Sequence, residues 1–323
     1  MSPAQSSFAQ DRDVANPIKV SVQAEPRHID SWLALARRLE SSGFEALLVG
    51  DHPGSGASPW PALGAAAAVT STLKLGTYVL QAGVRDPIQV AADAATLDVL
   101  APGRVLLGVG AGHTFSEWEV TGVPRPTPSD RAGRLEEFVD AVVALLRGKT
   151  VTMHGRYINL VDARLDDLPT GGRVQLVVGG GHPRVLRAGA ARAQVVALSG
   201  LGRTRPDGHR HDVRWSAADL RAQLDLIRQA SADRDSTPEI EALVQILKGT
   251  AHRSRGLVEV SQRLELDGVA VDDLDSTPFL LVGTVEEMAG QLQRQAAELG
   301  ITRYVVREDA VDLAAQILEL LDN

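Results

Sequence analysis

An acidic residue and an imidazole stand side by side at Asp51 and His52, directly after the apolar segment Ala46–Gly50. Such a pair can hold or transfer a proton near neutral pH, because the unperturbed pKa of histidine is about 6.5. The alternative is structural: Asp51 caps the next helix and His52 packs in a loop. The position of the pair at the end of a predicted strand favours a role in a functional site.

Two glycine-rich segments offer backbone rather than side-chain chemistry. Gly108–Gly112 (GVGAG) does not fit the dinucleotide-binding fingerprint, since its third glycine is misplaced and no helix opens directly after it. It indicates close backbone approach to a flat ligand, or else a simple turn. Gly179, Gly180 and Gly181 lie between a predicted strand and a predicted helix, where backbone N–H groups can bind a phosphate. A tight turn with positive φ is the alternative.

The remaining candidates are weaker. His209 to Asp212 (HRHD) could suggest a metal site, but no further ligand set has convincing spacing, so a solvated loop is the better interpretation. Trp60 and Trp118 follow the second and fourth predicted strands and could line a pocket, although packing in the core is the usual role of such residues. We predict no metal site.

Composition narrows the class of protein. The chain has 323 residues, a net charge of −8 and no cysteine, which excludes disulfides and thiolate chemistry. Only Lys19, Lys74, Lys149 and Lys248 are lysines, and the acidic balance argues against nucleic acid or an anionic membrane as partner. No apolar run approaches the roughly 20 residues of a membrane helix. Residues 1–16 are polar and predict a flexible arm without a signal sequence, so we expect a cytoplasmic protein.

These candidates must be positioned by alternating strands and helices. The predicted strands are short and apolar throughout: Ile18–Ala24, Ala46–Gly50, Leu73–Leu80, Arg104–Val109, Val174–Val178, Gln194–Leu198, Glu241–Leu247 and Arg303–Val306. The predicted helices are Ser31–Ser42, capped by Asp30, and Pro61–Thr70, Pro87–Leu100, Arg131–Leu146, Pro183–Ala193, Ala217–Gln229, Arg255–Leu266, Thr284–Leu299 and Ala310–Leu321.

Apolar strands that alternate with helices indicate a parallel sheet covered on both faces. About eight such units favour a (β/α)8 TIM barrel of the α/β class, with the site at the carboxyl ends of the strands. The surplus residues, in 149–173, 200–216 and 267–278, predict insertion loops at that face. No linker divides the chain, so we expect one domain over residues 17–323.

The run from Pro87 to Gly112 (PIQVAADAATLDVLAPGRVLLGVGAG) resembles the hallmark segment of the bacterial luciferase-like flavin superfamily. Asp51-His52, the segment 76–79 (GTYV), the segment 176–190 (LVVGGGHPRVLRAGA) and the segment 280–306 follow in that family's order. The chain is most similar to the branch that uses the deazaflavin coenzyme F420, common in actinobacteria. The resemblance implies a (β/α)8 barrel and hydride transfer between the deazaflavin C5 and an organic substrate.

The resemblance also implies roles for individual residues. The family's acid–base histidine matches His52, with Asp51 beside it contacting the cofactor, and its non-prolyl cis peptide matches Tyr78–Val79. Its phosphate-contacting glycines match Gly179, Gly180 and Gly181, and Gly112 and Ser116 are further cofactor-binding candidates. His113 stands where a sugar-phosphate dehydrogenase branch carries a glutamate, so it is a second catalytic candidate. That difference and the scarcity of lysine argue against a sugar-phosphate substrate.

The leading hypothesis is therefore an F420-dependent oxidoreductase that acts on a small organic molecule, for example a natural-product-like one. An FMN-dependent luciferase-like monooxygenase is the first alternative, because FMN also joins a tricyclic ring to a phosphate. A cofactor-binding family member without catalysis is the second. The resemblance implies a small-molecule substrate, and a homodimer is a frequent assembly in this family.

Overall fold

The structure is a computed structural model that describes residues 18–166, 168, 173–205, 211–266 and 269–322. The predicted arm of residues 1–16 lies outside these ranges, and the single domain over 17–323 stays a prediction. Within the described part of the chain, no helix is long and apolar enough to cross a membrane.

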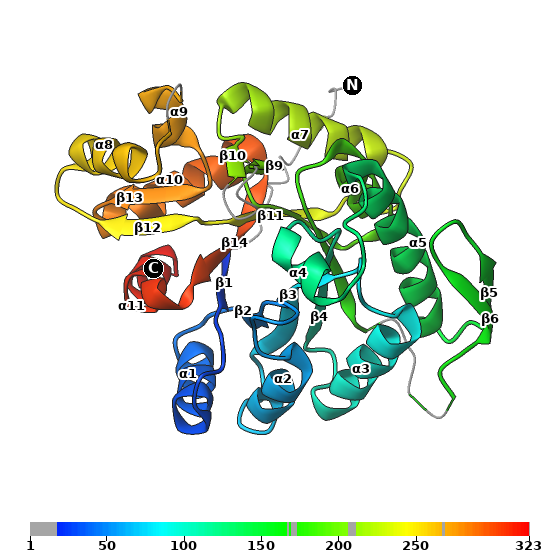
Figure 1. Cartoon of the computed structure of the whole chain (residues 1–323). Helices are drawn as coiled ribbons and strands as arrows, with labels where there is room; N and C mark the ends of the chain where they lie inside the picture. Colours follow the sequence, from blue (N-terminus) through cyan, green and yellow to red (C-terminus); the bar gives the residue numbers. More distant parts are fainter. Residues whose placement is uncertain (1–17, 167, 169–172, 206–210, 267–268, 323) are drawn as a thin grey trace, which may run out of the picture.

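Eight parallel strands close into a barrel, as predicted (Figure 1). Around the barrel they run β1 (Lys19–Gln23), β2 (Ala46–Val49), β3 (Lys74–Gln81), β4 (Val105–Gly110), β7 (Gln175–Gly179), β8 (Val195–Leu198), β11 (Glu239–Leu243) and β14 (Ile301–Arg307). Pairing of β1 with β14 closes the ring. Every barrel strand overlaps a strand predicted from sequence, because each is an apolar run covered on both faces.

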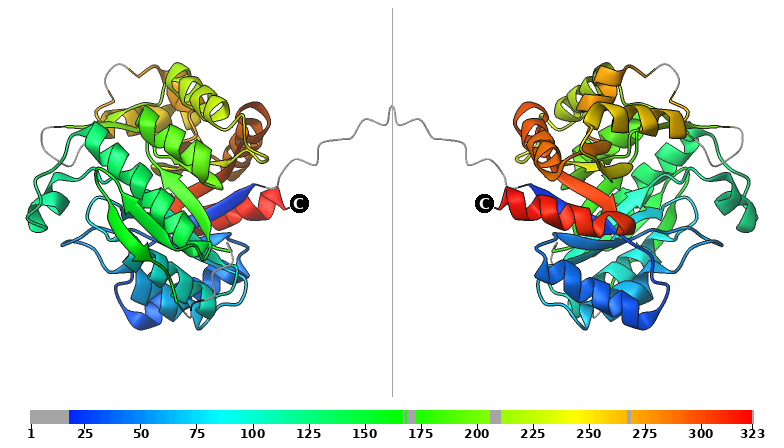
Figure 2. Two further views of the ribbon diagram at one scale, coloured as in Figure 1. Left: turned by 90° about the vertical axis from the view of Figure 1, so that its right-hand side faces the viewer. Right: turned by 90° about the vertical axis from the view of Figure 1, so that its left-hand side faces the viewer.

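Helices cover the outside of the barrel (Figure 2). They are α1 (Ile29–Ser41), α2 (Pro59–Ala67), α3 (Pro87–Leu100), α5 (Pro128–Leu146), α6 (Pro183–Arg192), α7 (Ala217–Ala230), α10 (Val285–Leu299) and α11 (Val311–Leu321). Local sequence sets their ends: Asp86 accepts from two N–H groups at the start of α3, and Gly300 ends α10 in the left-handed conformation. The prediction that Asp30 caps the first helix is wrong. His28 caps α1, and its side chain accepts a hydrogen bond from the backbone N–H of Asp30.

Further elements interrupt the regular alternation. They are α4 (Phe115–Val120), the hairpins β5 (Val151–His154) with β6 (Asn159–Ala163) and β9 (Leu201–Thr204) with β10 (His211–Val213), then β12 (Ile246–Gly249), α8 (Arg253–Arg263), α9 (Val271–Ser276), β13 (Leu280–Gly283) and the 3-10 turn η1 (Glu308–Ala310). The β9–β10 hairpin follows the carboxyl end of β8, as predicted for an insertion. The β5–β6 hairpin instead precedes β7 and so starts at the opposite end of the barrel.

The single strand predicted over Glu241–Leu247 is two strands in the structure. β11 stays in the barrel, whereas β12 leaves it and pairs in parallel with β13. The carbonyl of Phe279 accepts from the backbone N–H groups of Gln245 and Ile246, at the point where the chain turns away. Tertiary hydrogen bonding therefore overrides a continuous apolar sequence pattern.

The amino-terminal end of the barrel carries a buried ion network. Arg303, which is 1% exposed, faces carboxylates of Glu241, Glu239 and Glu45 at 3.3, 3.2 and 3.5 Å. Lys19 pairs with Glu239 and Lys74 with Glu45, each at 2.8 Å. Since Lys19 and Lys74 begin barrel strands and Lys149 follows the end of α5, these three lysines lie at this end of the barrel.

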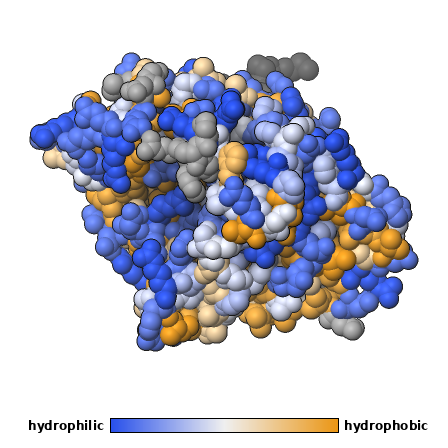
Figure 3. Space-filling model, viewed as in Figure 1, coloured by the Kyte–Doolittle hydropathy of each residue, from blue (hydrophilic) through white to orange (hydrophobic). Residues whose placement is uncertain are grey.

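Apolar side chains are also visible on the surface, over α2 and α3 at the lower edge of the molecule (Figure 3). On α3, Val99 and Leu100 are exposed.

Candidate active site

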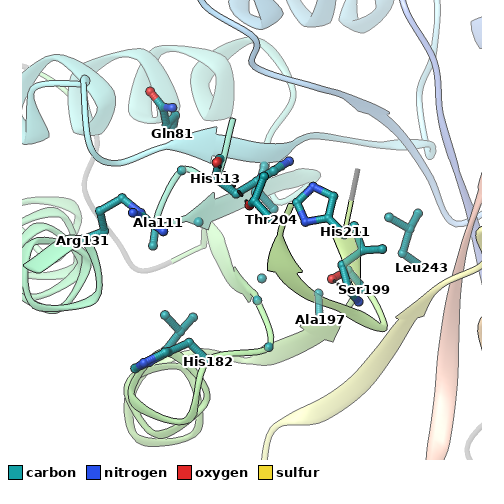
Figure 4. A pocket seen from close by; sticks show the side chains of 18 of the residues that line it. Gln81, Ala111, His113, Arg131, His182, Ala197, Ser199, Thr204, His211 and Leu243 are labelled. Carbon is teal, nitrogen blue, oxygen red and sulfur yellow. Dashed lines mark hydrogen bonds between the residues drawn. The ribbon is translucent and has the colours of Figure 1, made fainter. Parts of the chain in front are cut away.

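A cavity of about 830 Å³ opens at the carboxyl ends of the barrel strands. Its wall combines strand ends, the start of α5, the turn before α6 and the β9–β10 hairpin (Figure 4). Nine of the ten residues predicted from sequence line it: Asp51, His52, Tyr78, Val79, Gly112, His113, Gly179, Gly180 and Gly181. The tenth, Ser116, lies on α4 and is not part of the lining, although its neighbours Phe115 and Glu117 are.

His52 forms the central polar pair of the cavity with a residue that the sequence analysis missed. Its Nδ1 lies 2.7 Å from Oε1 of Glu117, whose side chain is buried. The second carboxylate oxygen of Glu117 accepts from Nε2 of Gln81 at 2.7 Å. Glu117 is therefore held from two sides. Its carboxylate fixes the orientation of the imidazole, with Nδ1 as the nitrogen that faces it.

The hydrogen bond that His52 donates to the Glu117 carboxylate raises the pKa of His52 above its ordinary value. Burial of the ring acts in the opposite direction, and the negative charges of Glu117 and other nearby carboxylates add to the rise. Because the side chain of His52 is 41% exposed, its other ring nitrogen, Nε2, can reach a ligand in the cavity. The pair can thus present a proton donor to the cavity at neutral pH.

Asp51 is engaged by the protein itself. Its carboxylate receives the Nη2 and Nε groups of Arg85 at 2.5 and 3.0 Å and the backbone N–H of Gln81 at 3.1 Å. The contact to a cofactor that the resemblance implies stays a prediction. What the geometry shows is an ion pair that ties the end of β2 to the segment after β3.

The glycines of β4 are explained first by strand packing. A Cβ on Gly108 would overlap the carbonyl oxygen of Thr77, and a Cβ on Gly110 would lie 2.7 Å from Cγ2 of Val79. The register between β3 and β4 shifts between Thr77 and Leu80, and the Tyr78–Val79 peptide bond within this shift is cis, as predicted. Gly112 has a φ of 74°, and a Cβ there would meet the side chain of Gln81.

The glycine turn after β7 offers fewer free donors than its sequence indicates. The N–H of Gly180 donates to the carbonyl of Ala197 at 3.1 Å. A Cβ on Gly180 would also lie 2.8 Å from Cγ1 of Val185, so this residue is required by packing. Within the described ranges, the N–H groups of Gly181 and His182 donate to no protein acceptor. These two groups remain for a ligand at the start of α6.

His113 faces the β9–β10 hairpin across the cavity mouth. Its ring lies 4.8 Å from that of His211 in an edge-to-face arrangement. Loss of hydration, followed by electrostatic repulsion between the two histidines, lowers the pKa of His113 to about 4. His211 therefore belongs to the cavity wall, and the interpretation of its segment as a solvated loop is wrong at this residue; His209 and Arg210 lie outside the described residues.

Other aromatic residues have packing roles. Trp118 is 1% exposed in the interior, and Trp60 packs against the apolar core, in line with their expected role. Besides Glu117, sequence analysis missed Arg125 and Arg131 in the cavity wall. A carboxylate in the first turn of the helix that follows a glycine-rich strand end could have indicated Glu117, but nothing in the sequence distinguishes Arg131 from the other arginines.

Comparisons with known proteins agree on the family. The model of the family described as luciferase-like monooxygenase matches residues 14–303. The F420-dependent glucose-6-phosphate dehydrogenase of Beutenbergia cavernae is 38% identical over 194 residues, which are 56% of this chain and 55% of that protein. The chain thus spans about half the length of the curated relatives it matches.

Solved structures share the fold over nearly the whole chain. The F420-dependent tetrahydromethanopterin reductase of Methanopyrus kandleri superposes with a TM-score of 0.71 and 17% identity, over 94% of this chain and 97% of that one. The EDTA monooxygenase of Chelativorans superposes with a TM-score of 0.74 and 13% identity, over 95% and 94%. At this identity the likeness establishes the barrel and leaves the reaction open.

Proposed function

Because the chain belongs to the luciferase-like monooxygenase family, we propose that it is an F420-dependent oxidoreductase. It transfers a hydride between C5 of the deazaflavin and a small organic substrate. The single observation that carries the proposal is the His52–Glu117 pair in the cavity, because hydride transfer to carbon requires a matching proton transfer at the neighbouring atom.

The residues present fit such a cofactor. The cavity of about 830 Å³ is of the size of a small-molecule site, and Gly110, Gly179 and Val79 give it a wall with few side-chain atoms. The backbone N–H groups of Gly181 and His182 lie where they could donate hydrogen bonds to a phosphate. The bound deazaflavin would supply the hydride-accepting or hydride-donating carbon. The chain supplies orientation, exclusion of water and the proton.

His52 would hold the proton that balances hydride transfer. With its pKa raised by Glu117, the imidazole is protonated at neutral pH to a greater extent than a free histidine. In the reducing direction it donates that proton to the atom next to the carbon that receives hydride. In the oxidising direction the neutral imidazole accepts it, and the carboxylate of Glu117 stabilises the resulting charge.

The names of relatives support F420 and leave the substrate open. The first curated relatives are called F420-dependent glucose-6-phosphate dehydrogenases, which makes glucose 6-phosphate the competing substrate. The cations that line this cavity are Arg125, Arg131, Arg203, Arg214 and Arg307, with no lysine among the described lining residues. We propose a small organic molecule as the substrate, and because arginine also binds phosphate, we include glucose 6-phosphate in the test.

The first test is titration of the purified protein with F420 and with FMN. Tight binding of F420 with negligible binding of FMN supports the proposal. The reverse result supports an FMN-dependent monooxygenase. Binding of F420 without turnover in a broad substrate screen, glucose 6-phosphate included, supports a member that has lost catalysis.

The second test is His52→Ala, in stopped-flow measurements of deazaflavin oxidation or reduction. We expect F420 to bind normally and the hydride step to slow by roughly 10²-fold or more, the usual scale of general acid–base catalysis. Unchanged turnover would mean that water supplies the proton. His28→Ala, an exposed histidine at the cap of α1, is the matched control.

We propose a small-molecule substrate, a second copy of the chain as the partner in solution, and a cytoplasmic location. Light scattering on the purified protein measures its mass and tests the homodimer directly.

A further inference from the structure

One cation at the mouth of the barrel has a neutral partner. Arg307 ends β14 and lines the cavity, and its register partner across the closing seam is Gln23, the last residue of β1. Its Nη1 donates to Oε1 of Gln23, and among the described residues no carboxylate forms a salt bridge with it. Arg214, also in the cavity wall, shows the usual arrangement, since it pairs with Asp219 at 3.0 Å. Because a guanidinium has five N–H donors, Arg307 keeps donors for a ligand.

The strand geometry directs Arg307 into the open end of the barrel. Side chains alternate along a strand, so Arg307 lies on the same face of β14 as Val305. Val305 belongs to a buried cluster of side chains from neighbouring barrel strands, and this cluster also contains Leu243 at the end of β11. Leu243 lines the cavity too, so Arg307 and Leu243 offer a charge and an apolar surface on the same side of it.

Gly50 keeps space between this side and the proton donor. A Cβ at Gly50 would lie 3.2 Å from Nε2 of Gln23 and 3.3 Å from Nε2 of His52. The imidazole nitrogen and the amide that holds Arg307 are therefore within reach of one small molecule. Nε2 of Gln23 is already used, because it donates to the carbonyl of Tyr78 at 2.8 Å. Arg307 and His52 thus supply a positive charge and a proton to this space.

The surroundings of Arg307 favour a ligand with a single negative charge. The carboxylates of Asp309 and Glu25 act on its charge without forming a salt bridge with it. They would repel a phosphate dianion more strongly than a carboxylate, and a guanidinium binds a carboxylate through two parallel N–H groups. In Figure 4, Leu243 lies on the side of the cavity away from His182, where the phosphate of the cofactor is proposed to bind.

We propose that Arg307 anchors the carboxylate of the substrate, and that the substrate is a 2-hydroxy acid, or the 2-oxo acid in the reverse direction, with an apolar group at C2. The inference rests on the proposed function for the cofactor, whereas the anchor itself requires only the acid. With the carboxylate on Arg307, the adjacent hydroxyl can reach Nε2 of His52. The oxidation removes a hydride from C2, which the cofactor accepts, and a proton from the hydroxyl, which His52 accepts, and it leaves a carbonyl group.

Binding of matched compounds tests the anchor without the cofactor. Lactate, mandelate and 3-phenyllactate are compared with their neutral methyl esters by the melting temperature of the full chain at equal ionic strength. We expect the acids, and not the esters, to raise the melting temperature of the wild type and of Arg27→Met, which replaces an exposed arginine outside the cavity lining. The rise should be lost in Arg307→Met and reduced in Arg307→Lys, which keeps the charge but not the fork.

The second measurement is turnover with F420. In Arg307→Met we expect the KM for the best acid to rise roughly 10- to 100-fold, the scale of hydrogen bonds to a charged group, with the Kd for F420 unchanged. Gly50→Ala is a second variant, because its methyl group would fill the space between Gln23 and His52 and leave Arg307 in place. It should also weaken binding of the acids.

The outcomes separate this anchor from the proposed function. If no acid raises the melting temperature of the wild type more than its ester does, or if Arg307→Met responds as the wild type does, the anchor is overturned. If the acids bind through Arg307 and F420 does not bind, the anchor stands and F420 dependence fails. If F420 binds, and the wild type and Arg307→Met turn over the same substrates equally, the proposed function stands and the anchor fails.

Discussion

At the scale of single residues, two histidines face the cavity in opposite electrostatic conditions. A hydrogen bond donated to the Glu117 carboxylate raises the pKa of His52, whereas loss of hydration lowers the pKa of His113 to about 4. At neutral pH His113 is therefore uncharged and can accept or donate a hydrogen bond, and His52 is the candidate for the acid. This separation of pKa values is the usual sign of distinct roles in an active site.

Removal of the carboxylate partner should change the pH dependence of catalysis. In the direction that consumes a proton, the rate falls as the pH rises through the pKa of His52. Glu117→Gln removes the charge that raises this pKa, so we expect the descending limb of the hydride-transfer rate to move to lower pH, with F420 affinity little changed. Stopped-flow rates measured across pH test this.

Glu119→Gln, an exposed change on the same helix, provides the control and should leave the profile in place. A rate that drops by the same factor at every pH in Glu117→Gln would show that Glu117 only maintains the structure. His113→Ala should leave the position of the limb unchanged.

At the scale of elements, one side chain connects α1 to the segment before β3. Oε1 of Glu40, in the last turn of α1, accepts backbone N–H groups of Ser71, Thr72 and Leu73 at 2.7, 2.6 and 3.0 Å. These bonds lower the pKa of Glu40 to about 2. The carboxylate thus positions the entry to the strand whose end carries Gln81.

We expect Glu40→Gln to lower the melting temperature at neutral pH. A depressed pKa means that the stabilisation is present above the unfolded value of 4.5 and is lost as the pH falls towards about 2. The difference in melting temperature between variant and wild type should therefore shrink below pH 4.5. Calorimetry across pH measures it, and a difference that is independent of pH would contradict this account.

Sequence predicts the elements well where their pattern is local. The strand ends that carry His52 and Gly179 follow from apolar runs, because parallel barrel strands must be buried on both faces. Glu117 and Arg131 were missed because their positions depend on how α4 and α5 cross the barrel rim. The separation of β12 from β11 could not be predicted for a related reason. The carbonyl that accepts the hydrogen bonds at the point of separation belongs to Phe279, which is distant in sequence.

At the scale of the whole molecule, the barrel contains charges that must remain paired. Lys19 and Lys74 would still balance Glu239 and Glu45 without Arg303, but Glu241, whose side chain is 2% exposed, has no other cation within the described residues. Burial already raises the pKa of Glu241. The ion pair therefore couples β11 to β14 near the seam where the barrel closes.

Arg303→Met should destabilise the protein by about 3–5 kcal/mol, the cost of leaving a buried charge unpaired. The double variant Arg303→Met/Glu241→Leu should recover most of that loss, because both charges are then absent. Urea unfolding of the wild type, both single variants and the double variant completes the cycle. Additive losses would show that the two side chains stabilise the barrel independently.

The placement of the lysines has a practical consequence for handling the protein. Lys19, Lys74 and Lys149 all lie at the end of the barrel opposite the cavity, and the cations at the cavity mouth are arginines, which do not react with amine-directed reagents. The fourth lysine, Lys248, is on β12, after the carboxyl end of β11. In a Lys248→Arg variant with a blocked α-amino group, coupling through activated esters should therefore attach the molecule by the amino-terminal end of its barrel. A sensor surface or resin prepared in this way would present the open mouth to solution, with ligand binding preserved.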